Sequence, residues 1–290
     1  MGHLPTENLD NLREFITTVR KKAIEHYKAG EVGTAVALVE LLAKDIEEEV
    51  LPENDDETEY HDFTQPIEYQ LYKHYNSDSE KEINWIEIPC SHVFFDYGAL
   101  LMDVKRYDDS RAALLKSLEC NPANAMAYYE LAEIYKATGN MCDDYVAKIK
   151  EGFKYAYTPE LFAKGIRSLG FYFSEKKQYD VAVCCYELSK YYDPKSPMAE
   201  NEMKYIAKMT GKEIETPSID EIKECAAKND FPVLPPQEML NCIDIHLKAA
   251  LEQHTKTQSP EDYEVVKYFS LLAGRLVFDD NDHQPRLTKR

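Results

Sequence analysis

A 34-residue repeat in the middle of this 290-residue chain constrains its fold more than any other feature. The first repeat begins at Ser91. Five of its residues are matched 34 positions later: Phe94, Tyr97, Gly98, Leu101 and Tyr107 correspond to Tyr128, Leu131, Ala132, Tyr135 and Met141. A third repeat, counted back from Pro194, begins at Ala163, and the middle repeat is four residues longer. Repetition at this length is typical of solenoid proteins, in which each repeat is stable only when it stacks on its neighbours.

The placement of small and large residues predicts that each repeat is a pair of antiparallel helices. The eighth position holds a small residue in all three repeats: Gly98, Ala132 and Gly170. The twentieth holds Ser110 in the first repeat and Ala182 in the third, whereas the middle repeat has Asp144 there. Small residues let the two helices approach closely, and large residues at the fourth, seventh and eleventh positions fill the seam.

The detailed spacing identifies a family. The middle repeat reads Tyr128-x-x-Leu131-Ala132-x-x-Tyr135, followed by Gly139-Asn140. The third reads Gly170-x-x-Phe173, then Tyr179-Asp180-x-Ala182 and Asp193-Pro194. Residues 91–196 therefore resemble tetratricopeptide repeats, and residues 19–42 resemble a weaker copy. The resemblance implies an all-α fold, an α–α superhelix of the tetratricopeptide solenoid type, with helical caps at both ends.

Patterns on either side of the repeats divide the chain into five expected parts. These are an N-terminal helix pair with a weak repeat (8–50), an acidic loop and irregular docking segment with a short helix near 66–75 (51–90), three repeats plus a further first helix beginning at Met198 (91–211), a short helix and Pro-rich connector (212–236), and a C-terminal helix pair (237–280). The outer pairs are expected to cap the solenoid, and a poorly capped end would allow homo-oligomers to form through the solenoid ends.

Charge and composition exclude several classes of partner. The chain has 53 acidic and 34 basic residues, a formal net charge of −19. Nucleic acid or an anionic membrane would be repelled by such a surface. No stretch approaches the roughly 18 apolar residues that a membrane-spanning helix needs. The seven cysteines contain no Cys-x-x-Cys pair, which favours a reducing cytoplasm.

Enzyme motifs are not evident in the sequence. The eight histidines form no group with metal-ligand spacing, and there is no Gly-rich phosphate loop or Gly-x-Ser-x-Gly elbow. We therefore predict a protein that is not an enzyme, with no metal and no cofactor.

The family resemblance also implies where a partner would bind. In that family the first helices line a concave groove, which the second, fifth, ninth, twelfth and thirteenth positions of each repeat face. On this chain, these positions include the candidate peptide-binding residues Phe95, Met102, Tyr129, Glu133, Lys136, Lys164, Arg167 and Phe171. Aromatic rings and methionines offer adaptable apolar contacts, and bases can pair with a carboxylate. The alternative is that residues 63–90 or the C-terminal helices of the protein itself cover these positions.

One ligand of the family does not fit. The clamp that holds chaperone tails needs lysine, asparagine and arginine at five groove positions, which here hold Phe95, Ala99, Glu130, Lys164 and Ser168. Only Lys164 matches. We therefore predict a protein–protein interaction module, an adaptor or scaffold that binds another peptide or protein segment. The alternatives are a peptide-responsive regulatory protein that acts on another protein, and a small helical enzyme.

Overall fold

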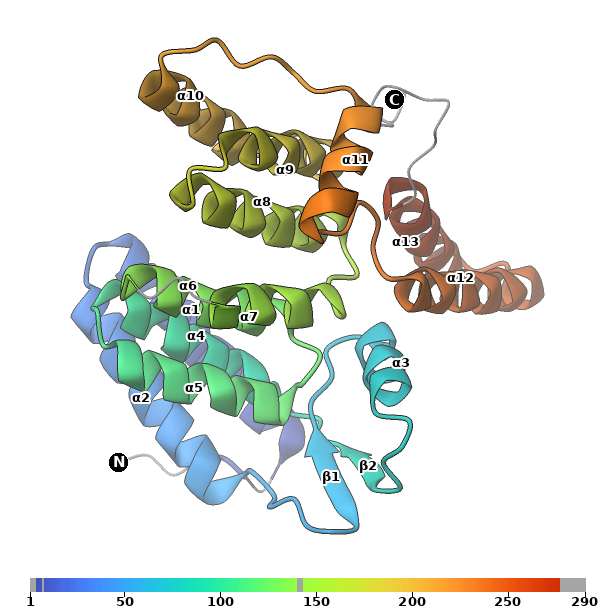
Figure 1. Ribbon diagram of the computed structural model, residues 1–290. Coiled ribbons are helices and arrows are strands. Elements are labelled where there is room, and N and C mark those ends of the chain that lie inside the picture. The colour runs from blue at the N-terminus through green and yellow to red at the C-terminus, as the bar shows by residue number, and fades with distance from the viewer. Residues whose placement is uncertain (1–3, 7, 140–142, 277–290) are drawn as a thin grey trace. The chain divides into compact units, whose positions relative to one another are not determined.

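The computed structural model describes residues 4–6, 8–139 and 143–276. In this part of the chain it has thirteen helices and two short strands (Figure 1). The expected all-α class is confirmed. Contacts within the chain define two compact units, Met1–Asn140 and Met141–Arg290. We call them unit 1 and unit 2 and describe each by itself.

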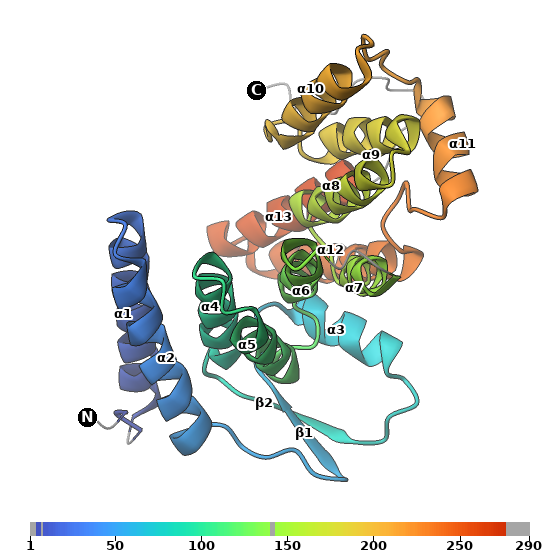
Figure 2. The same ribbon diagram turned by 60° about the vertical axis from the view of Figure 1, so that its left-hand side comes forward.

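Two stacked helical hairpins form most of unit 1. Its elements are α1 (Leu9–Lys28), α2 (Val32–Glu49), β1 (Thr58–His61), α3 (Pro66–Tyr75), β2 (Glu82–Trp85), α4 (Cys90–Asp103), α5 (Tyr107–Cys120) and α6 (Ala125–Ala137). The α1–α2 pair lies beside the α4–α5 pair, with α2 against α4 (Figure 2). Buried residues of α1, α2 and α4, among them Ile16, Val39 and Phe94, share one core. The N-terminal hairpin therefore stacks on the repeat that begins at Ser91, although residues 50–89 separate them in sequence.

Small residues lie where the paired helices approach most closely. A Cβ atom added at Gly98 would stand 2.6 Å from Leu114 Cγ on α5. The buried Ser110 hydroxyl donates a hydrogen bond to the Gly98 carbonyl oxygen at 2.7 Å, so its polar group is satisfied within the seam. These contacts explain why the eighth and twentieth positions of the repeat are small.

Residues 50–89 form an insertion between the two hairpins. β1 pairs with β2 in parallel, from Thr58 opposite Glu82 to His61 opposite Trp85, and α3 connects the strands. The helix over 66–75 was expected from the sequence, but the strands were not, and they replace part of the predicted irregular segment. Each strand has only four residues, which is too short for an alternating pattern to be distinguished.

Buried carboxyl groups fasten this insertion to α4 and α5. Asp62 Oδ2 accepts a hydrogen bond from Ser91 N at 2.7 Å, and Asp62 N donates to the Cys120 carbonyl at 2.9 Å. Glu68 Oε2 accepts from Asn121 Nδ2 at 2.9 Å. Burial raises the pKa of Asp62 to about 7. The insertion thus supplies an acceptor for a free backbone N–H at the start of α4.

Unit 2 contains a second tight hairpin and the C-terminal helices. Its elements are α7 (Asp143–Phe153), α8 (Pro159–Glu175), α9 (Tyr179–Tyr192), α10 (Met198–Thr210), α11 (Ile219–Asn229), α12 (Gln237–Thr257) and α13 (Pro260–Leu276). α8 pairs with α9, and both α10 and α11 pack on α9 (Figure 1). A Cβ atom at Gly170 would stand 2.9 Å from the Tyr186 ring, so this seam is also tight. The α12–α13 hairpin meets α8 where Arg275 Nη2 lies 2.6 Å from Glu160 Oε1.

One backbone feature recurs in both units and fixes the register of the repeats. Just after each first helix, the fifteenth position has a positive φ: 81° at Gly30, 62° at Lys105, 72° at Gly139, 61° at Lys177 and 67° at Gly211. A left-handed residue is a common way to end a helix before a turn. Since Gly211 shares this geometry, α10 is the first helix of a fourth repeat, counted from Pro197.

Candidate functional site

The fourth repeat stops after its first helix. Residues 212–217 continue from α10 without helical structure, and the next helix, α11, packs on α9. The eighth position of this repeat holds Lys204, whereas the α8–α9 hairpin has Gly170 there. A lysine side chain occupies the space into which a closely packed second helix would have to fit. Lys204 is therefore incompatible with a second helix that packs on α10 as closely as α9 packs on α8.

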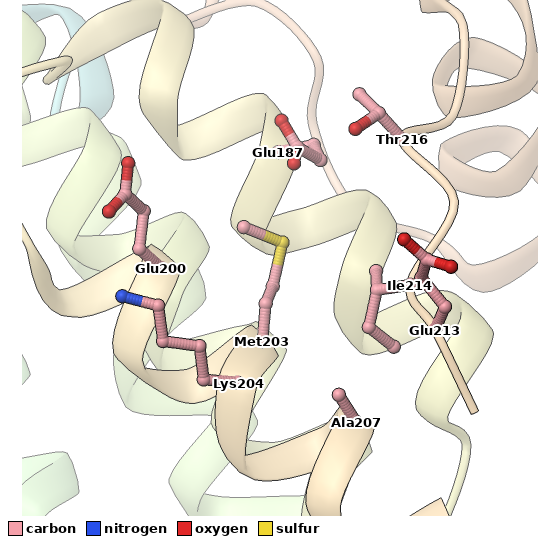
Figure 3. A pocket seen from close by; sticks show the side chains of 8 residues that line it. All are labelled: Glu187, Glu200, Met203, Lys204, Ala207, Glu213, Ile214 and Thr216. Carbon is pink, nitrogen blue, oxygen red and sulfur yellow. The ribbon is translucent and has the colours of Figure 1, made fainter. Parts of the chain in front are cut away.

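The side of α10 that would face a second helix borders a hollow of 280 Å³ (Figure 3). Its lining from α10 comes from the fourth, seventh, eighth and eleventh positions: Glu200, Met203, Lys204 and Ala207. The other lining residues come from α9 and from the segment after α10: Glu187, Glu213, Ile214 and Thr216. Figure 3 shows the Met203 side chain between Glu200 on one side and Glu187 and Glu213 on the other. The hollow thus combines an apolar floor with carboxylates at its edge.

The opposite side of α10 carries three large apolar residues in contact with solvent. Met198, Tyr205 and Met209 are 57%, 49% and 56% exposed. They occupy the second, ninth and thirteenth positions, which are groove positions in the resembled family. The sequence pattern predicts this helix, but the predicted groove residues include none of its positions. Counting 34 residues on from Ala163 would have found them.

The predicted groove residues of unit 2 lie together on one face of α8. Lys164, Arg167 and Phe171 are all half-buried. Arg167 Nη1 lies 3.1 Å from Asp193 Oδ2 just after α9, and these side chains are only 12% and 17% exposed. α8 also contacts α10, so the groove positions of the third and fourth repeats are on neighbouring helices.

Two predicted groove residues of unit 1 contribute to its own packing. Phe95 and Met102 on α4 are partly buried against a cluster of Leu114, Leu131 and Ile134. They therefore help to hold α5 and α6 against α4, and only part of each side chain remains for a partner.

The three predicted groove residues on α6 differ in accessibility. Tyr129 is fully buried, and burial raises the pKa of its hydroxyl. The sequence predicts that Tyr129 faces the groove, but its side chain is not accessible to a ligand. A repeat position identifies one side of a helix but not the side chains that cover it. Glu133 and Lys136 are half-exposed and lie 3.1 Å apart as an ion pair.

Unit 1 has a hollow of 240 Å³ between α1, α2 and α4. It is lined by Arg20, Ala23, Ile24, Tyr27, Val39, Asp96, Ala99, Leu100 and Asp103. Ala99 and Asp103 stand at groove positions of the repeat. Arg20 Nε pairs with Asp96 Oδ2 at 2.7 Å, and a hydrogen bond to Asp103 raises the pKa of Tyr27. This hollow can accept an apolar side chain beneath a charged rim.

The insertion does not fill this hollow. Residues 63–90, all of which the structure describes, contribute nothing to its lining. The insertion reaches α4 at a different point, where Thr64 Oγ1 lies 3.4 Å from His92 Nε2 at the second position of the repeat.

A comparison with known families agrees with this geometry. Residues 113–149 match the family model of the tetratricopeptide repeat. The chain therefore contains a tetratricopeptide repeat. The match begins within α5, spans α6 and ends within α7, so it includes the first helix of the middle repeat. Among curated proteins, none matches its sequence.

Two further features concern membranes and metals. None of the helices in the described ranges of the chain is long and apolar enough to cross a membrane. Across those same ranges, no three His, Cys, Asp or Glu side chains gather where they could hold a metal ion.

Proposed function

We propose that this tetratricopeptide repeat protein is a non-enzymatic adaptor or scaffold that binds a peptide or protein segment on the face of its first helices. One observation carries the proposal. α10 exposes Met198, Tyr205 and Met209 at the groove positions of the fourth repeat. Burial of apolar surface contributes about 25 cal/mol per Å², and large exposed apolar patches in soluble proteins usually mark interaction sites.

The neighbouring helix supports a particular ligand chemistry. Lys164 and Arg167 bring positive charge to the groove positions of a protein whose net charge is −19. A segment with apolar side chains and one carboxylate would bury its apolar part on α10 and form charge-assisted hydrogen bonds at α8. In unit 1, Phe95, Met102, Glu133 and Lys136 are the proposed contacts on the equivalent helices.

The proposed location is the cytoplasm. Cys90, Cys120, Cys184, Cys185, Cys225 and Cys242 are free thiols, which fits a reducing compartment. Disulfides are typical of secreted proteins of modest size, and these thiols show no sign of that use.

Site-specific crosslinking tests the proposal. A photoreactive benzoylphenylalanine at Tyr205 should crosslink a defined partner in an extract of the source cells. The double variant Met198→Ser with Met209→Ser should abolish that product, because it removes apolar contact area without touching the core.

A matched control keeps the test specific. Leu41→Ser with Leu115→Ser makes the same chemical change at exposed residues of α2 and α5, which are second helices. Its crosslink yield should equal that of the unaltered protein, and circular dichroism should show equal helix content in both doubles. Equal loss of crosslinking in the two double variants would contradict binding at the first-helix face.

A further inference from the structure

The hollow beside α10 lies on a different side of that helix from the proposed groove. Successive residues of an α-helix are rotated by about 100°, so the seventh and eleventh positions face roughly opposite to the second, ninth and thirteenth. Met203 and Ala207 therefore point away from Met198 and Tyr205. A molecule in the hollow would not compete for the groove face.

The occupant of this hollow is not a closely packed helix. In the complete hairpins, the second helix approaches so tightly that a single Cβ atom at Gly98 or Gly170 would stand within 3 Å of its side chains. Lys204 occupies the equivalent position on α10, and the chain itself passes this side of α10 as a non-helical segment, residues 212–217. The space that remains fits a side chain or an extended segment.

The lining determines the chemistry of that side chain. Met203, Ala207 and Ile214 supply apolar surface along which an aliphatic stem can lie. Carboxylates approach from three separate elements: Glu187 on α9, Glu200 on α10 and Glu213 in the segment after α10 (Figure 3).

The carboxylates differ in how available they are. Glu187 is 6% exposed and pairs with Lys190 on its own helix at 3.0 Å. Glu200 and Glu213 are exposed and can turn toward a ligand. An aliphatic stem that ends in a cation matches both features of the hollow, as lysine and arginine side chains do.

We propose that this hollow binds the side chain of an arginine or lysine from an extended segment of a partner protein. The aliphatic part lies against Met203 and Ile214, and the cation pairs with Glu200 and Glu213. The site is additional to the groove and does not depend on it.

Methionine methyl signals provide a direct test. The chain has eight methionines, so ¹³C-methyl labelling of the full-length protein gives few signals, and Met203→Leu identifies the one from the hollow. The probe is acetyl-Val-Arg-Val-amide, titrated to about 10 mM, which covers the affinity range of a single side-chain contact. The Met203 signal should shift in a saturable manner, and the Met198 and Met209 signals should not move.

Two controls separate charge from shape. The citrulline analogue of the probe has nearly the same shape without the charge, and it should produce no saturable shift. The double variant Glu200→Gln with Glu213→Gln should raise the dissociation constant at least about tenfold, since both charge-assisted contacts are lost. Glu202→Gln with Glu215→Gln makes the same change in net charge at residues that do not line the hollow, and it should leave the constant unchanged.

Three outcomes would overturn the proposal. They are equal shifts with the citrulline probe, shifts at Met198 and Met209 in place of Met203, and no shift at the highest concentration. None of them affects the groove proposal, whose crosslinking test uses residues on the other side of α10.

Discussion

The α8–α9 hairpin and α10 follow one another in the same repeat register, yet only the first is a complete hairpin. Gly170 lets Tyr186 pack directly onto the backbone of α8, and the seam between α8 and α9 is closed. At the equivalent position α10 has Lys204, its repeat stops at Gly211, and a hollow of 280 Å³ remains beside it. The closed seam and the open hollow thus differ at a position that the repeat register aligns, Gly170 in α8 and Lys204 in α10.

Enlarging the closed seam should produce the largest effect. We expect Gly170→Leu to lower the free energy of unfolding by about 3 kcal/mol, because overpacking a tight seam forces the helices apart. Urea denaturation followed by circular dichroism measures this change. Lys204→Leu places the same side chain at the same repeat position of α10, where it should change the stability by less than about 0.5 kcal/mol. An equal loss of stability in the two variants would show that Gly170 and Lys204 are packed equally tightly.

The N-termini of α4 and α8 are capped differently, and this difference makes the stability of the protein depend on pH. α8 is capped locally by Thr158 Oγ1, which accepts a hydrogen bond from Leu161 N, whereas α4 depends on Asp62 of the distant insertion. Burial raises the folded-state pKa of Asp62 to about 7 from an ordinary value of 3.8. The folded state therefore holds a proton that the unfolded state has lost between these two values, and stability falls as the pH rises through that window.

Asp62→Asn should remove this dependence, because it keeps an acceptor oxygen and carries no charge. We expect the variant to have a larger free energy of unfolding than the unaltered protein at about pH 8. This difference in free energy should be smaller by about 2 kcal/mol at about pH 5. Asp56→Asn, at an exposed position before β1, is the control and should show no such trend. A pH-independent difference between Asp62→Asn and the unaltered protein would contradict the buried, protonated carboxyl group.

The turns after the first helices offer a smaller test. Lys177 has a φ of 61° where the fourth repeat uses Gly211 at 67°. We expect Lys177→Gly to stabilise the protein by about 1 kcal/mol, because a side chain in the left-handed region carries a steric cost of that order. Lys176→Gly, one residue earlier where φ is −77°, should be neutral or destabilising. Thermal unfolding of both variants measures the two changes in stability. A loss of stability in Lys177→Gly would contradict the shared turn geometry.

The smallest expected effect concerns binding at the hollow. Lys204 also lines it. In the proposed binding mode, the Lys204 ammonium group competes with the bound cation for the carboxylates. We expect Lys204→Gln to lower the dissociation constant of acetyl-Val-Arg-Val-amide about threefold, a free-energy change within the range of an exposed ion pair. The same methyl-signal titration measures it. Weaker binding in this variant would indicate that the lysine contacts the probe favourably.

Much of the helical architecture could be predicted because each helix leaves a strong local pattern. The helices expected at 237–256 and 260–278 are found as α12, Gln237–Thr257, and α13, Pro260–Leu276. The capping box from Ser218 to Glu221 is present at the start of α11. The strands of the insertion could not be predicted, because each is four residues long and pairs with a segment more than twenty residues away.

The site was harder to predict than the helices. A repeat position defines which side of a helix a residue occupies, so Lys164, Arg167 and Phe171 could be placed on one face of α8. It does not define what covers that side, and Tyr129 is fully buried although its position faces the groove in the resembled family. The hollow beside α10 depends on the path of residues 212–217, for which the repeat supplies no pattern.

Hydroxyl-radical footprinting of the full-length protein tests most directly whether the first-helix face of α10 is open in solution. Met198 and Met209 are more than half exposed, whereas Met203 and Met239 are 9% and 0% exposed. We predict that Met198 and Met209 are oxidised at least about tenfold faster than Met203 and Met239, since methionine oxidation follows access to the sulfur. Equal protection of all four methionines would show that another part of the protein covers this face, and would contradict its proposed role in binding a partner.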